Sequence, residues 1–144
     1  MSAYLTGGTA LNIPSTEGTG DWHIGGTLLY PERFRVAGKD YVSTNTIFGS
    51  EGIFDCTEVL KERGVRVPEG VTVYAANHYR AVGDVIVNAL KKGWSWKDSV
   101  FADDWFPGDK EKIQLRDFLV KAMPKLLPVE REEITSWMRR EKLI

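Results

Sequence analysis

The chain has 144 residues, of which 42% are hydrophobic and 27% are charged, and its formal net charge at pH 7 is −1. This composition predicts one globular domain with a substantial core, and the near-zero charge gives no overall attraction to nucleic acid. No window approaches the roughly 20 apolar residues that cross a bilayer, and residues 1–13 lack the basic start of a signal peptide, so we expect a cytoplasmic protein without membrane contact.

The first part of the chain is rich in glycine and in β-prone residues. Residues 1–52 hold nine of the fourteen glycines. This texture predicts short strands and turns. The expected elements are, in order, a strand ending at Gly7–Gly8, a short helix capped by Thr9, strands over 22–30 and 34–46, and a tight turn over 36–42.

The remainder of the chain has a helical period. Helix-stop and helix-start residues divide it: Gly64 and Gly93 end helices, Asn77 caps one, and Pro128 opens another. The expected elements are a helix from 54 to 64, a strand over 71–75, a helix over 79–90, a connector over 94–109, a helix over 110–127 that Pro124 interrupts, and a last helix over 128–143.

Strands followed mainly by helices indicate an α+β fold. We predict a single domain over residues 1–144, with a small, mainly antiparallel sheet from the N-terminal half packed against about four helices, mostly C-terminal. Within it, residues 1–52 are expected to be strand- and turn-rich and residues 53–144 mainly helical.

Asp21 and His23 are candidate metal ligands. Two residues apart on a strand, their side chains share one face, where a carboxylate and an imidazole can bind a divalent ion. Two ligands are too few for a dedicated site, so a third must come from elsewhere. The alternative is a strand whose polar residues face water while Trp22 faces the core.

Gly7–Gly8 and Gly25–Gly26 are candidate phosphate-binding turns, because glycine allows the backbone to approach a ligand closely. Neither pair belongs to a G-x-G-x-x-G or P-loop motif. Turn geometry alone is therefore the alternative explanation.

The segment around Trp94, Trp96, Trp105 and Phe106 is a candidate surface for a protein partner. Aspartates are interleaved with these aromatic residues. Such a mixture disfavours a phosphate backbone and suits a basic or apolar protein surface. The alternative is a long connector that its tryptophans hold against the core.

Cys56 and His78 are less promising as catalytic groups. Cys56 lies on the apolar stripe of its expected helix, which indicates a buried, unreactive thiol. His78 stands at a helix start, where we expect a capping or surface residue rather than a base.

The opening of the chain resembles the nucleotidyltransferase-like proteins of bacterial toxin–antitoxin and abortive-infection modules. Those proteins show Gly-Gly-Thr-Ala-Leu on a short helix, followed by Asp-x-Asp; this chain has Gly7–Leu11 and then Asp21-x-His23. The stretch Tyr79–Val82, with Lys91–Lys92 and Lys97–Asp98 after it, looks like the downstream helix and basic segment of the family.

The resemblance implies a nucleotide site, with Mg²⁺ as its cofactor, at five positions: Gly7, Gly8, Thr9, Asp21 and His23. His23 stands where the family has a second carboxylate, and the strand expected at 71–75 offers no third acid. Two-metal transfer relies on such carboxylates. The resemblance thus implies an altered site that does not turn over, in a protein that acts mainly by binding another protein.

Two alternatives stay open. One is an active nucleotidyl- or ADP-ribosyl-transferase; the order His23, Ser43–Thr44 and Glu51 resembles that of ADP-ribosyltransferases. The other is a protein-binding inhibitor module that has no connection to nucleotides.

Overall fold

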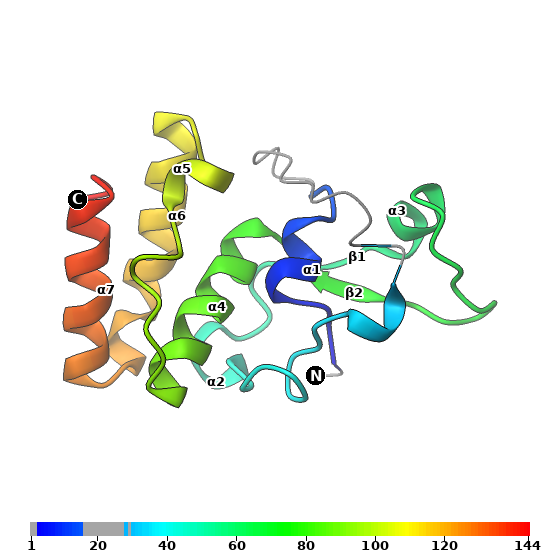
Figure 1. The fold of residues 1–144 in the computed structure, drawn as a ribbon, viewed down its shortest axis with the longest axis horizontal. Coiled ribbons are helices and arrows are strands. Elements are labelled where there is room, and N and C mark those ends of the chain that lie inside the picture. Colours follow the sequence, from blue (N-terminus) through cyan, green and yellow to red (C-terminus); the bar gives the residue numbers. More distant parts are fainter. Residues whose placement is uncertain (1–2, 16–27, 29) are drawn as a thin grey trace.

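The computed structural model describes residues 3–15, 28 and 30–144, and its fold is α+β (Figure 1). Helices α6 and α7 lie at one end of the long axis, α3 lies at the other, and α4 lies between them. The elements are α1 (Gly7–Leu11), η2 (Pro31–Arg33), α2 (Asn45–Phe48), β1 (Ile53–Asp55), α3 (Thr57–Glu62), β2 (Tyr74–Ala76), α4 (His78–Lys92), α5 (Ala102–Trp105), α6 (Asp109–Ala122), η3 (Met123–Lys125) and α7 (Pro128–Arg140).

The sheet is small and mainly antiparallel, as predicted. β1 pairs antiparallel with β2, with Ile53 opposite Ala76. Leu5 extends this arrangement through single bridges, parallel to Ala75 and antiparallel to Val36. Its N–H donates to the carbonyl of Tyr74 at 2.9 Å, so the N-terminal segment lies directly beside β2. Both named strands follow residue 52, in the part of the chain that was expected to be mainly helical.

Helix α4 is the central element, and its ends are those that the sequence indicates. The Asn77 side-chain oxygen accepts a hydrogen bond from the N–H of Arg80 at 2.9 Å, and Gly93 ends the helix with a φ of 70°. α1 and α6 both pack against α4. The larger hydrophobic cluster surrounds α4, α6 and α7, and a smaller one gathers around Leu5 and Cys56.

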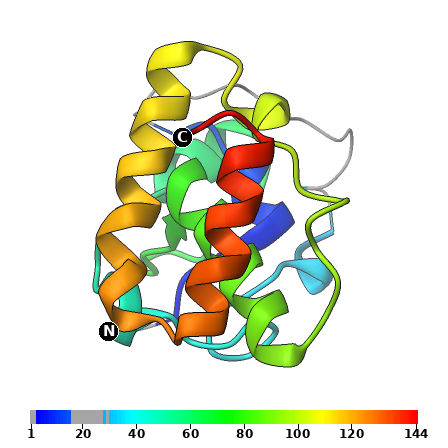
Figure 2. The same ribbon diagram turned by 90° about the vertical axis from the view of Figure 1, so that its left-hand side faces the viewer.

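Helices α6 and α7 run antiparallel beside one another (Figure 2). As predicted, Pro124 interrupts the helical run, within η3, and Pro128 occupies the first turn of α7. The Trp137 indole N–H donates to the Val100 carbonyl at 2.8 Å, which ties α7 to the preceding connector. Among the described residues, no helix has the length and apolar character needed to span a membrane.

Two predicted elements around residue 50 were wrong. The tight turn predicted over 36–42 is confirmed, with Gly38 at a φ of 82°. The strand expected over 34–46 is absent among the described residues: only single bridges occur beside the turn, and α2 follows it. The helix expected from residue 54 begins at Thr57, whose N–H is held by the Asp55 side chain at 2.9 Å. The left-handed φ values of Gly49 and Gly52 reverse the chain at this point, so the following residues pair with β2 instead of starting a helix. Of the strand expected over 22–30, residues 22–27 and 29 lie outside the described residues.

Candidate functional site

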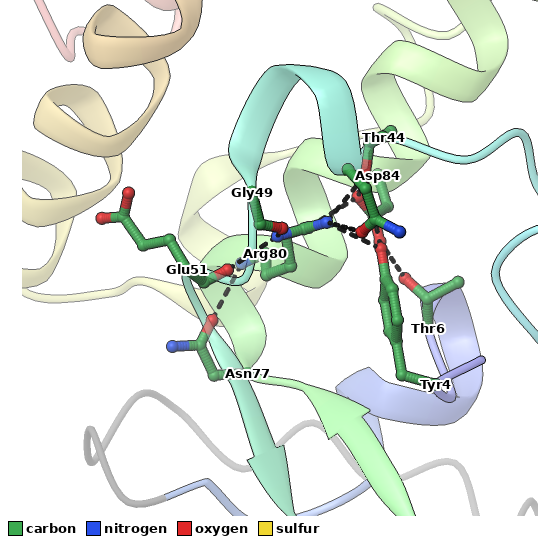
Figure 3. A network of polar contacts seen from close by, with 9 residues as sticks. Tyr4, Thr6, Thr44, Gly49, Glu51, Asn77, Arg80 and Asp84 are labelled. Atoms are coloured by element: carbon green, nitrogen blue, oxygen red, sulfur yellow. Dashed lines mark hydrogen bonds and ion pairs between the residues drawn. The ribbon is translucent and has the colours of Figure 1, made fainter. Parts of the chain in front are cut away.

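A buried ion pair lies on helix α4, within a network of polar contacts (Figure 3). Arg80 and Asp84 are one turn apart on α4, with side chains 0% and 1% exposed, and Arg80 Nε lies 3.1 Å from Asp84 Oδ1. Removing two charges from water is costly unless further hydrogen bonds satisfy them. The surroundings of this pair therefore decide whether it can bind a ligand.

The Asp84 carboxylate is satisfied by hydroxyl groups from distant parts of the chain. Its Oδ2 accepts hydrogen bonds from the Tyr4 and Thr6 hydroxyls, each at 2.7 Å. Its Oδ1 accepts one from the Thr44 hydroxyl at 2.5 Å. Burial, reinforced by the Asp84 charge, raises the pKa of Tyr4 to about 12, so this phenol stays a proton donor at neutral pH.

The Arg80 guanidinium is equally occupied. Its Nη1 donates to the carbonyls of Gly49 and Glu51, both at 2.8 Å. Its Nη2 donates to Tyr4 at 3.0 Å and to Asn45 at 3.2 Å. No N–H of this guanidinium is left for a ligand. The network joins residues 4–6, the segment 44–51 that contains α2, and α4, and it has a structural role.

Sequence reasoning missed this network, although one signal was present. Arg80 and Asp84 interrupt the apolar stripe of the expected helix at a spacing of four residues, which places them on one helix face. Thr44 belongs to it as well, and the Glu51 carboxylate pairs with Lys121 at 2.9 Å. Thr44 and Glu51, whose order along the chain resembles that of ADP-ribosyltransferases, thus both have partners within the fold.

The predicted nucleotide residues on α1 are engaged in local structure. Gly7 has a φ of 58°, and a Cβ at this position would lie 2.5 Å from the Tyr41 hydroxyl. The prediction that Thr9 caps α1 was wrong, since Thr6 is the N-cap. The buried Thr9 hydroxyl instead accepts a hydrogen bond from the Arg35 N–H at 2.9 Å. A Cβ at Gly8 would meet open space.

Asp21 and His23 lie outside the described residues, and their roles as metal and nucleotide ligands stay predictions. Within the described part of the chain, no group of three His, Cys, Asp or Glu side chains is placed to hold a metal ion.

The aromatic segment is divided between core and surface. Trp96, Trp105 and Phe106 are buried, so the prediction that they bind a partner is corrected: these three belong to the core. Trp96 contacts the Trp137 ring, and Phe106 stacks on Tyr79. No local pattern around these residues predicts their ring partners, which come from other helices.

Trp94 stays on the surface and lies in a groove of about 620 Å³ between the segment 93–98 and the start of α7. Trp94, Leu127 and Val129 line it and are 58%, 57% and 61% exposed. The Lys92 ammonium lies 4.7 Å from the centre of the Trp94 ring. The groove therefore presents three large apolar side chains to solvent.

The charged side chains around this groove are paired with one another. Glu130 accepts a hydrogen bond from the Leu127 N–H at 2.9 Å and pairs with Lys91 at 2.9 Å. Burial raises the pKa of the Glu130 carboxyl, but these two contacts outweigh burial and leave the pKa below its ordinary value. The other rim pairs are Lys97–Glu133 at 2.8 Å and Arg140–Asp98 at 3.0 Å.

Cys56 and His78 are both buried. Burial raises the pKa of the Cys56 thiol to about 11, in keeping with an unreactive side chain. The expectation that His78 is a capping or surface residue was wrong. Asn77 is the cap, and the buried His78 has its Nε2 2.9 Å from the Ile13 carbonyl oxygen.

Compared with known proteins, the chain matches no family model, and neither a curated protein nor a solved structure shows significant similarity to it.

Proposed function

We propose that this chain is a cytoplasmic, protein-binding component of a bacterial or phage toxin–antitoxin or defence-type system, with an altered nucleotide site. The observation that carries the binding role is the exposure of Trp94, Leu127 and Val129 around one groove. Burying apolar surface contributes about 25 cal/mol per Å², and a tryptophan with aliphatic neighbours is a common anchor of protein interfaces.

The charges around the groove favour an uncharged occupant. The pairs Lys91–Glu130, Lys97–Glu133 and Arg140–Asp98 neutralise one another. The Lys92 ammonium against the Trp94 ring adds a single positive charge, so the rim offers little net charge to a charged segment. The partner that fits is a different protein that inserts apolar side chains, for example from one face of an amphipathic helix.

The system class and the altered nucleotide site rest on the resemblance of the opening residues. Gly7 and Thr9 already have contacts within the fold, which supports a loss of catalytic use rather than an active transferase. The Mg²⁺ and nucleotide ligands would include Asp21 and His23, with His23 in place of a second carboxylate.

The test is binding of the product of the neighbouring gene in the same operon, measured by calorimetry with the purified proteins. Trp94→Ala and Leu127→Asp should each weaken binding at least about tenfold. Leu127 is the N-cap of α7, where aspartate is favourable, so that variant removes the apolar anchor without weakening the helix.

The matched control is Ile113→Asp, which changes an exposed apolar residue of α6 outside the groove. Equal binding by Leu127→Asp and Ile113→Asp would contradict the groove as the interface. Loss of a concentration-dependent dimer in Trp94→Ala, without any effect on the partner, would show that a second copy of the chain occupies the groove instead.

A further inference from the structure

Strand β1 forms one edge of the sheet. Its partner β2 lies on one side of it, and the bridge to Leu5 occupies the far side of β2. Among the described residues, no strand or bridge pairs with the other side of β1. The open side of an edge strand is a template for a further extended chain, because its backbone groups have no hydrogen-bond partners in the sheet.

The ladder between β1 and β2 shows which backbone groups point to the open side. The Cys56 N–H donates to the Val73 carbonyl at 2.9 Å, so a hydrogen-bonded pair follows directly after β1. Bonded and non-bonded pairs alternate along an antiparallel ladder, so Ile53 and Asp55 direct their N–H and C=O groups away from β2. The Ile53 N–H donates to Ser50 in the preceding turn. Within the described part of the chain, no hydrogen bond engages the Ile53 carbonyl or the Asp55 N–H.

A cavity of about 420 Å³ adjoins β1, the start of α4 and the middle of α6. Ile53 and Phe54 both line it, although they pack against different hydrophobic clusters. Successive side chains of a strand point to opposite faces of the sheet, so a cavity that touches both lies along the strand edge rather than over one face. Tyr79 and Phe118 provide further walls, and both are buried and stacked on other rings.

The charged side chains that line this cavity are paired. Lys121 pairs with Glu51 at 2.9 Å, and Asp117 pairs with Arg116 at 2.9 Å. The charges at the rim are therefore balanced. Together with the apolar walls, they favour an uncharged, apolar side chain as the occupant.

We propose that the open edge of β1 binds an extended segment of another protein by strand addition, with one large apolar side chain of that segment in the cavity. The backbone of the segment bonds to the Asp55 N–H and to the Ile53 carbonyl. In strand addition, main-chain hydrogen bonds provide affinity and side-chain pockets provide specificity. This surface is separate from the groove at Trp94 and does not depend on the proposed function.

The probe is a phage-displayed library of short random linear peptides, selected on the Trp94→Ala variant so that the groove at Trp94 does not compete. The selected peptides should share a large apolar residue, and calorimetry with the purified full chain should give one site per chain. Failure to select any peptide overturns the proposal.

N-methylation of the selected peptide tests the backbone contacts without any change to the protein. Only every second residue of an added strand directs its N–H toward β1. Methylation of one alternate set of peptide nitrogens should therefore weaken binding at least about tenfold, and methylation of the other set should have little effect. Equal effects of the two sets overturn the proposal.

Asp55→Pro and Asp55→Ala are a matched pair on the side of the protein. Both lose the side-chain contact with the Thr57 N–H, but only proline removes the backbone donor at the edge. Peptide affinity should be at least about tenfold lower for Asp55→Pro than for Asp55→Ala. Equal affinities of the two folded variants overturn the proposal. If Asp55→Pro does not fold, the N-methylated peptides decide the question.

A second pair of variants tests the cavity. Gln114→Trp places a bulky ring at its rim and should weaken peptide binding at least about tenfold. Val120→Trp places the same ring on an exposed position of α6 that does not line the cavity, and should leave binding intact. Equal affinities would place the apolar side chain elsewhere and overturn the proposal. A concentration-dependent dimer that Asp55→Pro abolishes would also overturn it, because a second copy of the chain would then occupy the edge.

Discussion

The Arg80 guanidinium and the Asp84 carboxylate form an ion pair at 3.1 Å that is fully enclosed by the protein. The guanidinium and the carboxylate each have neutral hydrogen-bond partners as well. Removing one charge therefore leaves the other buried among groups that are arranged to hydrogen-bond to an ion pair. The hydrogen bonds of the pair are complete only when residues 4–6, the segment 44–51 and α4 are all placed correctly.

Arg80→Met should lower the free energy of unfolding by about 3–5 kcal/mol, because it leaves Asp84 buried without its counter-ion. The double variant Arg80→Met with Asp84→Leu should cost less than the sum of the two single changes. Urea unfolding followed by circular dichroism measures all three.

Arg116→Met is the matched control for that experiment. Arg116 and Asp117 form a pair of similar length, 2.9 Å, that is largely exposed, and such pairs contribute about 1 kcal/mol or less. If Arg80→Met destabilised the protein no more than Arg116→Met, the central role of the buried pair would be refuted.

Tyr4 predicts a loss of stability at alkaline pH. Its pKa is raised from 10.0 to about 12 in the folded state, so the folded chain retains a proton that the unfolded chain releases above pH 10. The free energy of unfolding should therefore fall as pH rises from 10 to about 12. Tyr4→Phe removes this contribution, and urea titrations at pH 9, 10 and 11 should show a smaller decline than in the wild type. Parallel declines in both proteins would contradict this assignment.

Gly7 and Gly8 should respond oppositely to alanine. Gly7→Ala combines a left-handed φ with a Cβ placed against Tyr41, and should destabilise the fold by about 1–3 kcal/mol. Gly8→Ala meets open space within α1 and should be neutral or stabilise by up to about 1 kcal/mol. Thermal unfolding of the two variants decides this, and an equal loss in both would show that the strain at Gly7 has been overestimated.

Cys56 should be inert while the protein is folded. Its thiol is buried and has its pKa raised to about 11, so little thiolate is accessible at pH 8. Labelling with a disulfide reagent should proceed at the rate of unfolding and become rapid in denaturant. Rapid labelling of the native protein would instead identify Cys56 as a reactive group.

Elements with local signals were the predictable part of the fold. Asn77 and Gly93 define α4, and Pro128 defines the start of α7, because capping and proline effects act within a few residues of the chain. The strand at Ile53–Asp55 was missed because its pairing partner, β2, lies some twenty residues further along the sequence. Period alone does not separate a short strand from the first turn of a helix.

The functional regions were harder to predict for the same reason. Trp94 and Trp96 have similar neighbours in sequence, but only Trp96 contacts the Trp137 ring of α7 and is buried. Likewise, nothing near Asn77 in the sequence indicates that this residue lines a cavity together with residues of α6. The assignments of Asp21 and His23 stay predictions, since both lie outside the described residues.

The hydrogen bond from Tyr4 to Asp84 closes a loop of 80 residues, and the bridge from Leu5 to Ala75 closes one almost as long. During synthesis residues 4–6 emerge from the ribosome before β2 and α4, so their strand partner and their ionic anchor are made much later. We therefore expect this segment to dock only after α4 has emerged, so that residues 4–6 are among the last parts of the native structure to become protected from proteases.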